Sequence, residues 1–204
     1  ESLTNFARRA FLQVDNNRPV DIAGIEDPGP LSRPTVPEKI TINGLNKIRA
    51  EGGLGYLNTQ FELVELDDVI PSNLDQGDKL VSNKNYDQEL QPRDRDTTES
   101  LSQILELSDS TRFDPRELLY PNTTGKGGAP VVGPDSMVES GNGRTLVLGR
   151  IYKKGGDNLR IYKEGLKEWS AIYGLDPSRV DGMKQPILIR RRTDDLSRDD
   201  RLIF

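Results

Sequence analysis

Apolar and polar side chains alternate along residues 61–66, and this period of two predicts a half-buried β-strand. Another strand is predicted close to the C-terminal end, where Pro186 opens a short apolar run. The apolar positions in residues 98–108 recur at helical spacing and predict a helix with Thr97 or Thr98 as its N-cap. The side chains that share the buried face of this helix are Leu101, Ile104 and Leu105.

Three more helical segments follow. Residues 113–120 predict a helical turn, a helix begins near Arg144, and a longer helix covers residues 157–173. Trp169 and Tyr173 on this last helix are candidates for stacking on a base, although packing in the core is the favoured interpretation.

The remaining segments carry weaker patterns. Residues 3–13 predict a short helix, residues 18–37 predict a linker or arm rich in Pro, Gly and Asp, and residues 38–50 predict another helix. The polar residues 71–89 predict a mobile surface loop. The sequence contains no internal repeat.

Residues 129–148 combine a hairpin with a glycine-rich corner. Two apolar stretches flank a Gly-Pro-Asp-Ser turn, which is the pattern of a β-hairpin. The Gly141-Asn142-Gly143 corner that follows lets the backbone turn sharply and exposes amide N–H groups at the start of a helix, where an anion is favoured. Arg144 adds a forked, permanently charged partner for phosphate.

A steric explanation of the same corner stays open, because glycine-rich turns between strands and helices occur in many folds. The corner lacks the Gly-Lys-Ser/Thr ending of a Walker loop and the spaced third glycine of a dinucleotide fingerprint. The residues therefore indicate an anion site without identifying the anion.

Composition narrows the chemistry. The chain has 204 residues and a net charge of −5, so any contact with nucleic acid has to be local. Cys and His are both absent, which excludes disulfides, Cys or His metal sites, serine–histidine hydrolases, cysteine proteases, zinc deaminases and His-Asn-His nucleases. Catalysis would have to use carboxylates, lysine, arginine, hydroxyls or a metal held by oxygen ligands.

The sequence has no apolar run long enough for a membrane helix and no signal-peptide pattern, so we expect a soluble chain without a membrane partner. It begins without Met and ends on an apolar Leu-Ile-Phe, and both features predict a piece of a longer polypeptide.

Several separated motifs occur in the order typical of the ParB/sulfiredoxin superfamily, which this chain resembles. Residues 61–69 stand where that superfamily has its first strand, Gln91-Pro92-Arg93 resembles its first box, and Gly141-Asn142-Gly143-Arg144 resembles its second box. The phrases Glu-Leu-Gln-Pro-Arg-Asp-Arg, Val-Glu-Ser-Gly-Asn-Gly-Arg-Thr-Leu and Gly-Met-Lys-Gln-Pro-Ile-Leu-Ile-Arg give the closest likeness to the DdrB-like ParB domain of phage defence-against-restriction proteins.

The resemblance implies an α+β fold, with a small mixed sheet and packed helices, over residues 60–195. Residues 1–59 would form an irregular N-terminal extension, and residues 196–204 a C-terminal tail that leads into a longer protein.

The resemblance also implies a phosphate site for nucleotide or nucleic acid, formed by the two boxes. The residues that would bind phosphate or nucleotide are Gln91, Arg93, Gly141, Asn142, Gly143, Arg144 and Thr145. The residues that would contact nucleic acid are Arg95, Arg150, Lys153 and Lys154. A solvated surface is the alternative role of each basic patch, the Arg190-Arg191-Arg192 run included.

Asn142 stands where ParB proteins have a glutamate and sulfiredoxins a reactive cysteine, which excludes sulfiredoxin chemistry. Glu139 is the catalytic candidate that would replace the missing carboxylate, and strand alternation lets only one of Glu139 and Ser140 face the corner. Mg²⁺ or Mn²⁺, bound together with nucleotide phosphates, is the cofactor that such chemistry would use. The candidate metal ligands are Asp94, Asp96, Glu99 and Glu139, and helix capping is the alternative role of the first three.

Three functions stay open. The first is a phage or mobile-element domain that binds nucleotide or DNA in anti-restriction or DNA processing, as a metal-dependent nuclease, phosphodiesterase or NTP hydrolase. The second is a non-catalytic structural or partner-binding module of a large virion-associated or injected protein, and the third is a toxin-like nucleotidyl or phosphoryl transferase. We expect further domains of the same polypeptide as partners and the host cytoplasm as the location, reached by packaging in a virion and injection.

Overall fold

The described residues all fall within the unit Ile40–Phe204. The computed structural model describes residues 46–50, 52–91, 93–109 and 113–204. The helix predicted over residues 3–13 and the linker predicted over residues 18–37 lie outside the described residues, as does Pro92 of the first box.

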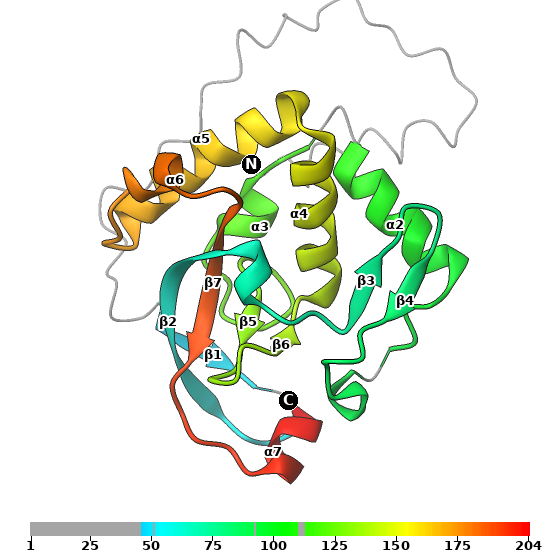
Figure 1. Cartoon of the computed structure of the whole chain (residues 1–204). Coiled ribbons are helices and arrows are strands. Elements are labelled where there is room, and N and C mark those ends of the chain that lie inside the picture. The colour runs from blue at the N-terminus through cyan, green and yellow to red at the C-terminus, as the bar shows by residue number, and fades with distance from the viewer. Residues whose placement is uncertain (1–45, 51, 92, 110–112) are drawn as a thin grey trace, which may run out of the picture. The chain divides into compact units, whose positions relative to one another are not determined.

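A mixed five-stranded sheet with the strand order β1-β2-β7-β5-β6 forms the centre of this unit (Figure 1). Its strands are β1 (Lys47–Arg49), β2 (Tyr56–Glu65), β5 (Val131–Val132), β6 (Val138–Ser140) and β7 (Pro186–Arg192). β2 and β7 pair antiparallel along seven residues of each, whereas β5 runs parallel to β7. The predicted early strand, the Pro-led late strand and the hairpin between β5 and β6 are confirmed.

Helices pack on this sheet, so the predicted α+β class is confirmed. They are α2 (Thr98–Asp109), α3 (Arg116–Leu119), α4 (Asn142–Lys154), α5 (Gly156–Ile172), α6 (Arg179–Gly182) and α7 (Arg198–Ile203). The Oγ1 atom of Thr97 accepts a hydrogen bond from the amide of Ser100 at 3.2 Å, so Thr97 is the N-cap of α2. No helix in the described part of the chain is long and apolar enough to cross a lipid bilayer.

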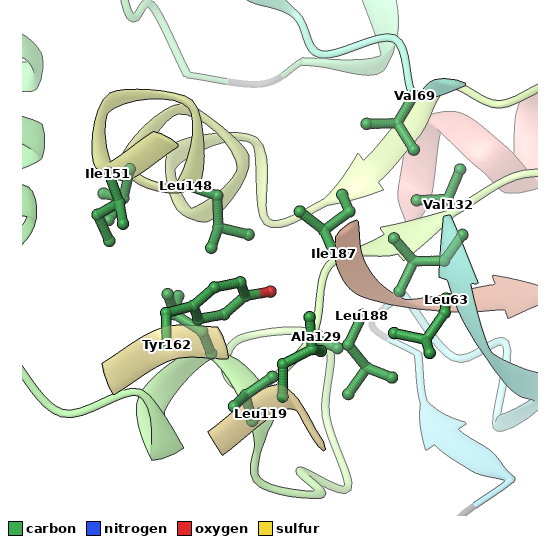
Figure 2. Packing of buried hydrophobic residues seen from close by; sticks show 14 of the residues in the cluster. Leu63, Val69, Leu119, Ala129, Val132, Leu148, Ile151, Tyr162, Ile187 and Leu188 are labelled. Carbon is green, nitrogen blue, oxygen red and sulfur yellow. The ribbon is translucent and has the colours of Figure 1, made fainter. Parts of the chain in front are cut away.

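The main core lies between the sheet and helices α3, α4 and α5. Figure 2 shows Tyr162 of α5 extending toward Ile187 and Leu188 of β7, with Leu148 and Leu119 on either side. All five side chains are fully buried. Tight packing of this kind fixes the position of α4 relative to the sheet, and thus the position of the glycine corner.

Two late aromatic residues join this core. Tyr173 stacks on Phe61 of β2 with ring centroids 3.7 Å apart, and its hydroxyl donates to the backbone oxygen of Leu119 at 2.6 Å. Trp169 is buried beside Tyr173. The core-packing interpretation of these two residues is therefore confirmed.

Two local predictions are wrong. Residues 47–49 form β1, which pairs with β2, although residues 38–50 predict a helix. Residues 71–89 predict a mobile loop but contain a hairpin of β3 (Asn73–Asp75) and β4 (Leu80–Ser82), and the short 3-10 helix η3 (Gln88–Leu90) begins at the end of this segment. This segment packs beside α4 because hydrogen bonds and ion pairs to distant residues, described below, hold it there (Figure 1).

Candidate functional site

The second box forms a sharp corner between β6 and α4. Gly141 has a φ of +95° and directly precedes the first turn of α4. A Cβ atom here would lie 2.7 Å from Nη2 and 2.9 Å from Nε of Arg144, so backbone conformation and close approach both require glycine. Gly141 offers no side-chain cap, and no described residue accepts a hydrogen bond from the amides of Gly143 and Arg144.

Arg95, two residues beyond the first box, lies against this first turn. A Cβ atom at Gly143 would be 3.1 Å from Nη1 of Arg95, so the guanidinium packs on the backbone of Gly143. Burial, followed by repulsion from Arg93, lowers the pKa of Arg95, and its Nε is buried without a partner among the described residues. The structure thus brings Arg95 to the open amides of α4, whereas the side chain of Arg93 is exposed.

Asn142 links the two boxes from inside the protein. Its side chain is buried, and its Nδ2 donates to Oε1 of Gln91 at 3.2 Å and to the backbone oxygen of Val138 at 3.0 Å. Its Oδ1 accepts the backbone N–H of Ser72 at 2.7 Å. Asn142 therefore fixes the first box, β6 and the start of the β3–β4 segment to the corner.

Replacing Asn142 with aspartate tests this link. The carboxylate keeps an acceptor for Ser72 but places an oxygen against the oxygens of Gln91 and Val138, so we expect a loss of about 1–3 kcal/mol in the free energy of unfolding. Urea denaturation measures the change, and Asn85→Asp at an exposed position is the control. Equal stability of the two variants would contradict the role of Asn142.

Arg144 is directed at backbone oxygens. Its Nη1 donates to Gly128 and its Nη2 to Gly125, each at 2.5 Å, and Ser140 donates to the same Gly125 oxygen at 2.7 Å. Burial, followed by the nearby Arg190 and Arg95, lowers the pKa of Arg144 to about 10. Arg144 therefore holds the 125–128 loop against the corner.

Glu139 lies on the face of β6 opposite to Ser140 and Arg144. Its Oε1 accepts from Nη2 of Arg192 and from Nε of Arg201, both at 2.8 Å, and its Oε2 accepts from Nε of Arg192 at 2.8 Å. The side chains of Glu139 and Arg192 are each 2% exposed. Of the two alternating residues of β6, Ser140 is the one on the side of Arg144, and Glu139 is engaged in a buried ion-pair cluster.

The arginine run at the end of β7 is built into the sheet. Arg190 is 1% exposed and lies over the ring of Phe61, 5.2 Å from its centroid. Arg191 pairs with Glu62 at 3.1 Å, and Arg192 pairs with Glu139. This run is therefore part of the fold and not a solvated basic patch.

The other predicted nucleic-acid contacts lie further along α4, away from the corner. Arg150 pairs with Asp75 at 2.6 Å and so anchors the β3–β4 hairpin, and Lys154 pairs with Asp109 at 2.9 Å. Lys153 is exposed. Thr145 is buried and donates to the backbone oxygen of Gly141 through its N–H at 3.0 Å and its Oγ1 at 3.2 Å. The structure does not bring Arg150, Lys153 or Lys154 to the two boxes, whereas Thr145, a predicted phosphate-binding residue, is bonded to Gly141 of the second box.

The acidic metal candidates are also separated. Asp96 accepts hydrogen bonds from Nδ2 of Asn73 and, at 3.0 Å, from Oγ of Ser82, while Asp94 and Glu99 are exposed. Among the described residues, no three carboxylate side chains gather in a group that could hold a metal ion. The metal ligands stay a prediction.

A pocket of about 570 Å³ opens beside Arg144. Arg144 and Val147 of α4 form one wall, and Tyr120 and Asn122 belong to the loop after α3. Its other lining residues are Leu107, Phe113, Asp114, Arg116, Glu117, Leu118, Lys126, Gly127 and Gly128. The pocket offers aromatic, apolar and amide groups, which suits an organic ring.

Sequence reasoning did not identify Ser72, Tyr120 or Asn122 as site residues. Ser72 contributes only its backbone N–H, and no residue pattern signals such a contact. Tyr120 and Asn122 flank a proline just before the Thr-Thr-Gly-Lys-Gly-Gly stretch, and this glycine-rich loop was the available signal for a close approach of backbone to a ligand.

The family model of the ddrB-like ParB superfamily domain matches residues 55–193, a segment that contains both boxes. No curated protein and no solved structure matches the chain.

Proposed function

This chain belongs to the ddrB-like ParB superfamily, and on that premise we propose that it binds the phosphate groups of a nucleotide at the N-terminus of α4. The observation that carries the proposal is the arrangement of Arg95 on Gly143, beside amides that have no acceptor in the described part of the chain. Backbone N–H groups at a helix start and a nearby guanidinium form a favourable environment for a phosphate oxygen.

The distribution of ion pairs supports the same proposal. Arg150, Arg191 and Arg192 each pair with a carboxylate. Within the described residues, Arg95 and Arg144 have no carboxylate partner although the chain carries a net charge of −5. A phosphate would supply the negative charge that these two side chains lack.

The pocket beside Arg144 favours a free nucleotide over a nucleic-acid backbone. Its volume of about 570 Å³ is in the range of small-molecule sites. We propose that the base of a nucleotide whose phosphate is held at α4 enters this pocket, which is lined by the aromatic residues Tyr120 and Phe113 and by the amide side chain of Asn122.

The finer parts of the function belong to the same proposal. We place this nucleotide-binding domain in a phage anti-restriction protein, with further domains in the same polypeptide and with the host cytoplasm as its location. Binding, and not cleavage, is the activity we propose, because Glu139 is engaged by Arg192 and Arg201. Mg²⁺ or Mn²⁺ would accompany the phosphates as a ligand-bound ion.

Replacing Arg95 with alanine tests the phosphate site. A ligand that binds only the folded chain raises its stability, by about 2.7 kcal/mol at one hundred times Kd. We expect ATP, CTP, GTP or UTP to raise the melting temperature of the wild-type chain. Arg95→Ala should lower the affinity for that nucleotide by about tenfold or more, because hydrogen bonds to charged groups contribute about 1.5–3 kcal/mol. Thermal-shift titration with and without Mg²⁺ measures both effects.

Arg160→Ala is the matched control. It removes the same charge from an exposed site on α5, where Arg160 pairs with Glu164 at 2.9 Å, and nucleotide binding should be unchanged. A melting-temperature shift of equal size in Arg95→Ala and the wild-type chain would contradict the site. A rise in melting temperature with short DNA, and with none of the four nucleotides, would mean that the site binds a nucleic-acid backbone instead of a nucleotide.

A further inference from the structure

The C-terminal helix α7 reaches both segments that lead into the boxes. Residues 194–204 lie beyond the family match, yet α7 folds back onto the domain (Figure 1). At its first turn, Arg198 pairs with Asp87 at 2.6 Å and with Glu89 at 2.5 Å. One turn later, Arg201 pairs with Asp135 at 2.9 Å and with Glu139 at 2.8 Å.

The partners of Arg198 belong to the entry of the first box. Asp87 accepts a hydrogen bond from the amide of Glu89 and so caps η3, and η3 ends one residue before Gln91. The orientation of η3 therefore sets the direction in which the chain enters the first box and approaches Arg95.

The partners of Arg201 belong to the entry of the second box. Glu139 is in β6, two residues before Gly141, and Asp135 is in the turn before β6. Apolar contacts hold α7 at the same place, because Leu196 and Phe204 pack on the small cluster that contains Ile48. Phe204 also approaches the loop that Arg144 holds, 3.8 Å from the position of a Cβ atom at Gly125.

We propose that α7 is a positioning element of the phosphate site, which fixes the first box relative to the second through Arg198 and Arg201. This inference rests on the proposed function for its consequence in binding. Arg201 is the inner anchor, since its side chain is 20% exposed, whereas the Arg198 side chain is 59% exposed and reaches η3 across the surface. Displacement of Arg198 then alters the approach of Arg95 to α4 and weakens phosphate binding without unfolding the domain.

A charge exchange at Arg198 tests the proposal in the full chain. Arg198→Glu places a carboxylate against Asp87 and Glu89, and Arg198→Glu combined with Glu89→Arg restores one ion pair with reversed polarity. Hydrogen exchange of the ligand-free protein is expected to rise about tenfold over residues 91–96 in the single variant and to return toward the wild-type rate in the double variant. An increase confined to residues 87–90 and α7 would show that α7 is a local cap and would overturn the proposal.

Titration with inorganic triphosphate adds the binding readout. We expect Arg198→Glu to bind triphosphate about tenfold more weakly than the wild-type chain, and the double variant to recover most of that loss. Unchanged affinity in the single variant would overturn the proposal. Absence of triphosphate binding in the wild-type chain would count against the proposed function. The hydrogen-exchange rates of residues 91–96 would then decide the role of α7 without the binding measurement.

Discussion

Replacing Glu139 with glutamine should lower the free energy of unfolding by about 3–5 kcal/mol, the range found when one partner of a buried ion pair is removed. The Glu139 carboxylate accepts three hydrogen bonds at 2.8 Å, two from Arg192 and one from Arg201. Glutamine retains one acceptor and turns an amide N–H toward guanidinium groups that can only donate. The Arg192 side chain, 2% exposed, then keeps a charge without a counterion.

The control for this prediction is Glu62→Gln. Glu62 also pairs with an arginine of β7, Arg191 at 3.1 Å, but the two side chains are 33% and 20% exposed. The loss of a pair in contact with water should be below about 1 kcal/mol. Urea denaturation with unchanged m-values measures both variants. If Glu139→Gln were as stable as the wild-type chain and had lost a metal-dependent turnover, Glu139 would be a catalytic residue instead.

Replacing Gly141 with alanine should destabilise the corner through two separate effects. A non-glycine residue held at φ +95° costs about 1–3 kcal/mol in backbone strain. The new Cβ would also lie 2.7 Å from the Arg144 guanidinium and displace it from the oxygens of Gly125 and Gly128. Each lost hydrogen bond from a charged group contributes roughly 2 kcal/mol.

Gly77→Ala separates the two effects. Gly77 has a φ of +100°, nearly the value of Gly141, and a Cβ atom there would meet nothing within 4 Å. This variant should show the backbone strain alone, so the difference between the two losses reports the displacement of Arg144. Equal destabilisation of Gly77→Ala and Gly141→Ala, measured by urea denaturation, would mean that Arg144 adapts without loss.

Much of the sheet and most helices follow from local patterns. The alternation in residues 61–66 corresponds to the second half of β2, which ends at Glu65. The Thr97 cap and helical spacing define α2, and the Gly-Pro-Asp-Ser turn separates β5 from β6. These features depend on neighbouring residues, and the corner before α4 was predicted for the same reason, since a glycine with positive φ leaves a signature in the sequence.

Contacts between distant residues account for the two elements that the sequence does not predict, the β3–β4 hairpin and β1. The hairpin in residues 71–89 is held by Arg150 on Asp75 and by Asn142 on the Ser72 amide, and neither contact is visible in a polar stretch read by itself. β1 has only three residues, and its conformation comes from pairing with β2.

The charged residues of the site show the same limit. Strand alternation predicts that Glu139 and Ser140 face opposite ways but does not select which faces the corner, because that choice depends on Arg192 in a strand far along the chain. The sequence predicts a surface patch at the run of three arginines because nothing local reveals that Phe61, Glu62 and Glu139 surround it.

The pairing of β2 with β7 also affects how the chain folds during its synthesis. Glu62 and Arg191 are neighbours in the sheet but 129 positions apart in the chain. During synthesis β2 leaves the ribosome long before its partner, and the centre of the sheet closes only when residue 192 has emerged. Closing such a loop is slow, so the nascent chain passes through a period in which the apolar face of β2 is open to chaperones, proteases and other nascent chains.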